Sequence, residues 1–304
     1  MEWDYDQLWN KAILWAQKAH EQDKGSTDFP LMCAICLEIL ARATLAYVHP
    51  ALLADPLDGE NIMYVFGFSQ TKQPKSIPIK TVFERCHKIV DKFTQAEIDF
   101  CMNMMYRRNQ ELHSGSNAFE DFPIKYWQYD FYRVLDLMLK SLNKGFDDLL
   151  SREEALMAKE MISEEFTKVQ NGVKQLIGFT KDEFYRKSEE ERKELIQNAI
   201  ALNFVDTMNS KYIQEVKCPA CGQTATISGE LTKIGDPVFR DDRIVRQISV
   251  LPTKLVCYVC ELRLNGYNKL HAAGYGGYFT IDEDYEPMDY FDFDPSDSYE
   301  YGND

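Results

Sequence analysis

Two pairs of cysteines in the C-terminal third place the strongest constraint on how this chain can fold. Cys218 and Cys221 flank Pro-Ala and precede a glycine, and Cys257 and Cys260 flank Tyr-Val after 35 intervening residues. Two C-x-x-C turns supply four thiolates, which close a tetrahedral site when β-hairpins bring the turns together. The spacing therefore predicts one structural zinc ion bound by all four cysteines, with no open position for a catalytic water.

The segments around these pairs have the pattern of short strands. From Tyr212 onward, β-branched and aromatic residues gather at 224–227, 244–255 and 277–281, bounded by Gly, Asp and Pro. The region 212–280 resembles a zinc ribbon with a longer than usual insert between its two cysteine turns. The alternative is that the four cysteines are unrelated buried thiols.

The remaining cysteines and the apolar runs indicate in which cellular compartment the protein is expected. Cys33 and Cys36 also have C-x-x-C spacing, but they lie in the apolar run LMCAICLEIL and are interpreted as packing residues. Eight cysteines in 304 residues are too few for a disulfide scaffold. No basic-then-apolar leader is evident, and the apolar run 31–48 is interrupted by Glu38 and Arg42. We therefore expect a cytoplasmic protein without a membrane segment.

The N-terminal half has helical periodicity. Apolar residues recur at spacings of three and four in five segments: 8–19, 31–53, 82–93, 96–112 and 126–142. The chain is therefore predicted to be mainly α, with four parts. These are a helical bundle at 1–150, a helical connector at 151–211, the small β-rich ribbon at 212–280 and an acidic flexible tail at 281–304.

The tail dominates the net charge. Residues 281–304 hold ten acids and no Lys or Arg, so the formal charge of −15 falls to −5 for the rest of the chain. Acids alternate there with Tyr and Phe, which suggests two alternatives: a solubilising tail, or a nucleic-acid mimic that occupies a basic surface. The candidates for that surface are Lys254, Arg263, Lys269, Arg240, Arg243 and Arg246.

A second motif lies late in the segment 96–112. Arg108, Asn109 and His113 form the pattern R-N-x-x-x-H just before Gly115. On a helix, His113 lies about 40° from Asn109 and about 140° from Arg108, so Asn109 and His113 share a face that Arg108 flanks. The structural alternative is that His113 is a favourable cation in the last helical turn. A looser copy of the pattern runs from Arg42 to His49.

At these residues the chain resembles the HEPN superfamily, whose ribonucleases carry an R-x4-6-H motif. The resemblance covers about residues 1–150, and Glu38-x-x-x-Arg42 is similar to the charged spacing often seen on the preceding helix. It implies a metal-independent endoribonuclease that uses the RNA 2′-hydroxyl as nucleophile, with two motif copies facing each other across a homodimer. It further implies a toxin or antiphage defence role.

The resemblance also assigns roles to residues. His113 would act as acid or base, Arg108 would stabilise charge on the phosphoryl oxygens, and Asn109 would orient its neighbours, while Tyr106 would line the site. Two alternatives stay open. One is a non-catalytic RNA-binding module of the same fold. The other is an adaptor whose ribbon and acidic tail dock a regulatory protein partner.

Overall fold

The computed structural model describes residues 2–68, 72–209, 212–240 and 242–286. It divides the chain into two compact units, residues 1–165 and 166–304, which are described separately below. The division falls inside a single long helix, α8 (Arg152–Arg186), followed by α9 (Glu189–Asn209). The sequence pattern predicted a bundle that ends at residue 150 and a helical connector at 151–211.

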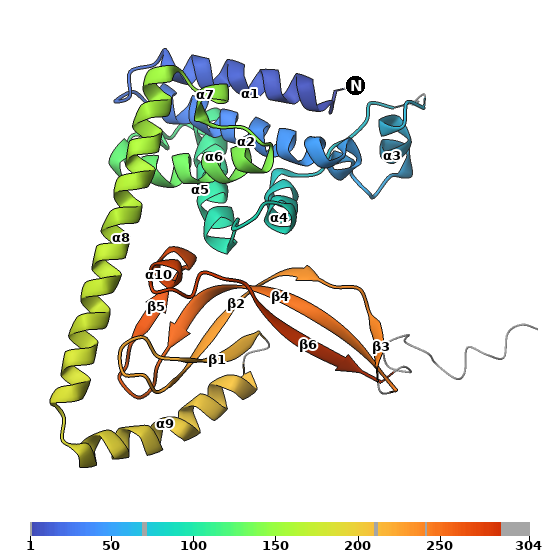
Figure 1. Cartoon of the computed structure of the whole chain (residues 1–304). Helices are drawn as coiled ribbons and strands as arrows, with labels where there is room; N and C mark the ends of the chain where they lie inside the picture. Colours follow the sequence, from blue (N-terminus) through green and yellow to red (C-terminus); the bar gives the residue numbers. More distant parts are fainter. Residues whose placement is uncertain (1, 69–71, 210–211, 241, 287–304) are drawn as a thin grey trace, which may run out of the picture. The chain divides into compact units, whose positions relative to one another are not determined.

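The helical unit contains the five predicted helices and two short ones that periodicity did not indicate (Figure 1). The additional helices α3 and α7 have seven and four residues, too few to show a repeat of apolar positions. Two 3-10 turns, Pro50–Leu53 and Ile124–Tyr126, complete the unit. Its helices are α1 (Tyr5–His20), α2 (Asp28–Val48), α3 (Gly59–Val65), α4 (Ile79–Ile89), α5 (Gln95–His113), α6 (Gln128–Ser141) and α7 (Phe146–Leu149).

Helix α2 is the central helix of this unit. Its residues are apolar nearly all round, and it packs against α1, α4, α5 and α6. Small side chains such as Ala12 and Ala16 on α1 let the two helices approach closely. Among the described residues, α2 alone is long and apolar enough to cross a membrane, but 56% of that stretch is buried inside the unit. This burial is typical of the core helix of a bundle.

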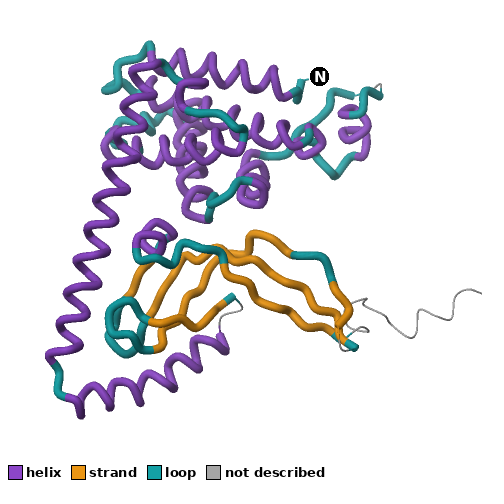
Figure 2. The backbone as a smooth tube through the Cα atoms, in the orientation of Figure 1, coloured by secondary structure: helices purple, strands orange, loops and turns teal. Residues whose placement is uncertain are grey.

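The second unit is built on an antiparallel sheet (Figure 2). The long strand β4 lies at its centre, with β2 and β3 along one edge and β5 and β6 along the other; β1 pairs with β2. Val173, Phe184 and Ala199 from α8 and α9 join the core of this unit. Its elements are β1 (Ile213–Lys217), β2 (Thr224–Ile234), β3 (Val238–Arg240), β4 (Arg243–Val256), β5 (Arg263–Asn265), α10 (Tyr267–Ala272) and β6 (Phe279–Tyr285).

Strand β6 contains the first residues that the sequence analysis assigned to a flexible acidic tail. It pairs with β4 from Phe279 to Tyr285, so residues 281–285 belong to the sheet. Glu283 forms an ion pair of 3.6 Å with Arg246 on β4, and Arg246 also donates to the Tyr285 hydroxyl at 3.0 Å. Arg243, another residue of the predicted basic surface, pairs with Glu286 at 3.1 Å. The rest of the predicted tail, residues 287–304, lies outside the described residues.

Gly229 marks a bulge in β2 and gives a test of the sheet. The register against β4 shifts between Ser228 and Gly229, and a Cβ at Gly229 would lie 1.9 Å from the carbonyl oxygen of Leu251. The atoms that would clash are main-chain atoms of β4, so a side-chain movement cannot relieve the clash. We expect Gly229→Ala to lower the free energy of unfolding of this unit by about 3 kcal/mol. Urea unfolding followed by circular dichroism measures the change.

The matched control is Gly172→Ala on α8 in the same unit. Gly172 is an exposed helical residue, and a Cβ there meets nothing within 4 Å. This change is expected to raise stability by up to about 1 kcal/mol, because alanine has the higher helix propensity. Equal effects of the two substitutions would contradict the bulge geometry.

Candidate functional site

Helix α5 carries the R-N-x-x-x-H motif, and its start is strongly specified. The Glu97 carboxylate accepts hydrogen bonds of 2.6 Å from both the backbone N–H and the hydroxyl of Thr94, which fixes the first turn. Cys101, Met104 and Met105 form the buried face of α5 against the core. The helix ends at His113, so the motif occupies its last two turns.

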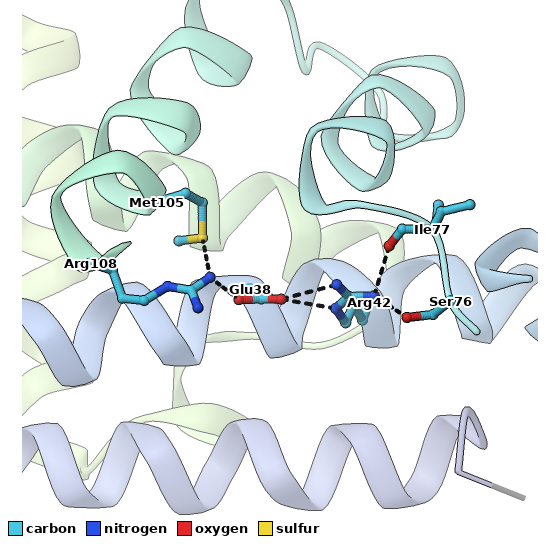
Figure 3. Close-up of polar contacts among 6 residues, drawn as sticks. All are labelled: Glu38, Arg42, Ser76, Ile77, Met105 and Arg108. Atoms are coloured by element: carbon cyan, nitrogen blue, oxygen red, sulfur yellow. Dashed lines mark hydrogen bonds and ion pairs between the residues drawn. The ribbon is translucent and has the colours of Figure 1, made fainter. Parts of the chain in front are cut away.

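The central feature of the site is an ion-pair row on α2 and α5 (Figure 3). Glu38 lies between two arginines: its Oε2 accepts from Nη2 of Arg108, and its Oε1 accepts from Nη2 and Nε of Arg42 at 3.0 and 3.1 Å. The Nη1 of Arg42 approaches the hydroxyl of Ser76 at 3.3 Å and the carbonyl of Ile77 at 3.5 Å. The Arg108 and Glu38 side chains keep only 19% and 16% exposure, so the low dielectric strengthens the pairing.

Arg108 keeps hydrogen-bond donors that no described residue uses. Besides Glu38, its Nη2 contacts only the sulfur of Met105, at 3.5 Å. Its Nε–H is buried without any partner, and no described acceptor bonds Nη1. The guanidinium is therefore oriented by one carboxylate oxygen, while its Nη1 group remains available to an anion.

The other predicted site residues lie on the exposed surface of α5. Asn109 and His113 are both exposed, and no described side chain bonds to either. Tyr106 is 63% exposed, and its hydroxyl accepts a hydrogen bond of 3.1 Å from Gln110. The structure thus brings Arg108 together with Glu38, a contact that the motif alone does not indicate, and leaves His113 at the end of the same helix.

Arg107, the neighbour of Arg108, has a structural role. Its guanidinium lies 3.9 Å from the centre of the Phe122 ring and donates to the carbonyl of Ala118 at 2.6 Å. Glu111 accepts from the backbone N–H of Ala118 at 2.7 Å. These contacts tie the segment after α5 back onto the helix, so the site has a fixed border.

The looser copy of the motif does not form a site of its own. Arg42 belongs to the Glu38 row, whereas the Nδ1 of His49 accepts from the backbone N–H of Ala51 at 3.1 Å. The His49 ring also lies 5.7 Å from that of Phe66. Each residue therefore has separate partners, and His49 serves as the cap of the following turn.

The four cysteines of the C-x-x-C pairs form a tight cluster. The sulfur atoms of Cys218, Cys221, Cys257 and Cys260 all lie within 4.8 Å of one another, and they could hold a metal ion such as zinc. The closest pairs are Cys218 with Cys260 at 3.5 Å and Cys221 with Cys257 at 3.6 Å. Hydrogen bonds from the other three thiols lower the pKa of Cys218 below that of an ordinary thiol.

The two cysteine turns have the same backbone geometry. In each, the N–H of the first cysteine bonds the carbonyl five residues later, at 2.7 Å for Cys218 to Gln223 and 2.9 Å for Cys257 to Leu262. In each, the residue after the second cysteine has a left-handed conformation, φ 74° at Gly222 and 61° at Glu261. The turns are therefore preorganised to direct two sulfurs each toward one point.

The cysteines of the helical unit have different chemistry. Cys33 and Cys36 are buried in the core, as their place in an apolar run predicted, and burial raises the pKa of Cys36 to about 12. Burial likewise raises the pKa values of Cys86 and Cys101. These thiols stay protonated near neutral pH and act as packing groups.

No protein-family model matches this chain, and no curated protein and no solved structure matches it. The functional interpretation therefore rests on the geometry of the ion-pair row, on His113 and on the cysteine cluster.

Proposed function

We propose that this chain is a metal-independent endoribonuclease of the HEPN type. The observation that carries the proposal is the Arg108–Glu38 ion pair. This ion pair orients the Arg108 guanidinium on α5, the helix that ends in His113. Some N–H donors of the guanidinium remain unused. An oriented arginine and an exposed imidazole in the last two turns of one helix suit the stabilisation and proton transfer that phosphodiester cleavage needs.

In this mechanism the RNA 2′-oxygen attacks the adjacent phosphorus and the bond to the 5′-oxygen breaks. One imidazole accepts the 2′-hydroxyl proton and an imidazolium returns a proton to the leaving 5′-oxygen, so a cyclic phosphate and a 5′-hydroxyl form. Arg108 binds the phosphoryl oxygens, Asn109 orients its neighbours and Tyr106 lines the site. Because one chain offers a single His113, we propose that two chains join their motifs in a homodimer.

The cysteine cluster has a structural role in this proposed function. We infer that Cys218, Cys221, Cys257 and Cys260 bind zinc and complete a zinc ribbon, which positions RNA or a regulatory protein partner. A role as a toxin or antiphage defence effector would fit a nuclease kept under such control. We therefore assign catalysis to the helical unit, because four sulfurs would fill the coordination sphere of zinc and leave no position for a catalytic water.

The test uses RNA incubated with the purified protein in a buffer to which no Mg²⁺ or other divalent metal ion is added. Wild-type protein is expected to cut the RNA and leave cyclic-phosphate ends, and His113→Ala to cut at least about 100-fold more slowly. His20→Ala is the matched control, since His20 is also an exposed last residue of a helix. DNA of the same sequence is expected to stay intact because it lacks the nucleophile.

Equal cutting by wild type and His113→Ala would show a contaminating nuclease and remove the proposal. The ion pair also supports a second candidate, a non-catalytic module in which Arg108 only holds α5 on α2. RNA that the wild-type protein binds but never cuts would select this second function.

A further inference from the structure

A cleft of about 400 Å³ adjoins the ion-pair row. It is lined by residues of α1, by Arg42 of α2, by Leu53 and by Ser76, so Arg42 belongs both to the row and to the cleft wall. From α1 the cleft is lined by Gln7, Leu8 and Lys11, and Glu2 and Trp3 line it just before that helix. The cleft and the proposed phosphate-binding Arg108 are therefore linked through Glu38.

We propose that this cleft binds one unstacked nucleotide of a single-stranded RNA whose scissile phosphate lies at Arg108. The inference rests on the proposed function and names its substrate class. The volume lies within the range of about 300–1,000 Å³ that small-molecule sites occupy. Sequence-dependent RNA recognition usually targets bases that have left the stack, and such a base needs a pocket of this kind.

Lys11 provides the charge for the phosphate of this nucleotide. It lies on the exposed side of α1, and no described acid pairs with it. Arg42 cannot take this part, because its Nε and Nη2 bond Glu38 while its Nη1 approaches Ser76 and Ile77. Arg42 is a positioning residue, which fixes the wall shared by the cleft and the row.

The remaining lining suits a base. Trp3 and Leu8, each 7% exposed, line the apolar part of the cleft, and Gln7 and Ser76 offer hydrogen-bonding groups. Glu2 is the acid of this lining, and its backbone N–H donates to the Tyr64 hydroxyl at 3.0 Å. A carboxylate accepts hydrogen bonds and repels phosphate. Glu2 would therefore face the edge of the base, where an exocyclic amino group can donate to its carboxylate.

The test measures binding of a labelled 2′-O-methyl RNA, which the protein cannot cut, by fluorescence anisotropy at several salt concentrations. Lys11→Ala is expected to raise the Kd about five- to tenfold and to reduce the salt slope by about 0.7, the value for one lost phosphate contact on a single strand. Gln7→Trp fills the cleft without changing charge, so it should raise the Kd and leave the slope unchanged. Lys140→Ala is the control, because Lys140 is an exposed lysine of the helical unit that pairs with Asp136.

The outcomes separate the cleft from the nuclease. If Lys11→Ala and Gln7→Trp bind RNA like wild type while the wild type cuts RNA, the cleft proposal is overturned and the proposed function stands. If the wild type binds RNA without cutting and both variants bind more weakly, the cleft stands and the nuclease falls. If Lys11→Ala weakens the binding of AMP but leaves RNA binding unchanged, the cleft binds a free nucleotide and the proposal is overturned.

Discussion

Removing the metal from the cysteine cluster is expected to unfold the sheet unit and leave the helical unit folded. The cluster joins the turn before β2 to the turn after β4, so four bonds from the Sγ atoms to the proposed zinc ion would close the end of the sheet. Binding of a structural zinc supplies about 10–16 kcal/mol in small zinc domains, as much as the whole stability of a typical domain. Cys257→Ser should therefore abolish zinc binding and most protection of the sheet.

Two signals distinguish the units in this experiment. All four tryptophans, Trp3, Trp9, Trp15 and Trp127, lie in residues 1–165, so tryptophan fluorescence reports only on the helical unit. Hydrogen–deuterium exchange of residues 213–285 reports on the sheet. Wild-type protein should contain about one zinc per chain by elemental analysis. A strong chelator should release it, speed exchange in the sheet and leave the fluorescence unchanged.

The control for the substitution is Cys36→Ala, which removes a thiol from the other C-x-x-C pair. Cys36 is buried in the helical core and its Sγ contacts the Ala12 carbonyl at 3.5 Å. This variant should keep its zinc and lose stability in the fluorescence signal instead. A wild-type protein that folds fully without metal, or a Cys257→Ser variant that retains the ion, would contradict a structural zinc site.

The four-cysteine cluster was predictable from the sequence because its geometry is largely local. Each C-x-x-C turn fixes two sulfurs within four residues, and only the meeting of the two turns depends on the fold. The helices α1, α2, α4, α5 and α6 were predictable for a similar reason, since each is long enough to repeat its apolar face. The structure confirms a mainly α chain with a β-rich C-terminal part.

The composition of the ion-pair row was not predictable to the same degree. Glu38 and Arg42 are four residues apart on one helix, so their pairing follows from helical spacing. The contact from Glu38 to Arg108 joins residues 70 apart and exists only because α5 packs across α2. A motif search on α5 finds Arg108 but cannot find the carboxylate that orients it.

The acidic segment shows how composition can mislead. Ten acids without Lys or Arg across residues 281–304 suggested a flexible tail, because such a composition cannot bury a core of its own. A strand needs only alternate residues to be apolar, however, and Phe279 and Ile281 alternate with polar ones. Cross-strand pairing of Glu283 with Arg246 then neutralises the charge that remains on the same face.

Replacing Arg108 is expected to slow RNA cleavage about 10²- to 10³-fold while the protein stays folded. The arginine fork would meet two phosphoryl oxygens in the transition state, and removing one such donor group typically lowers kcat about 10²- to 10³-fold. Glu38 keeps its two hydrogen bonds from Arg42 when Arg108 is absent, so the carboxylate is not left unpaired. Arg108→Ala should therefore lower the free energy of unfolding by about 1.5–3 kcal/mol, the value for a hydrogen bond to a charged group.

Arg133→Ala separates the loss of an ion pair from the loss of catalysis. Arg133 pairs with Glu97 at 2.5 Å, and Glu97 retains its bonds from Thr94 when Arg133 is removed. Each alanine variant therefore removes an Arg–Glu pair whose carboxylate keeps other partners, so both variants should stay folded, while only Arg108→Ala loses cleavage.

Arg108→Lys adds a stricter test. A single ammonium can satisfy Glu38, but it cannot also offer the planar fork that binds two oxygens of one phosphate. This variant should recover stability and remain at least about tenfold slower than wild type. If Arg108→Lys cuts RNA at the wild-type rate, or if Arg133→Ala is as inactive as Arg108→Ala, then Arg108 acts through the fold alone and the catalytic assignment fails.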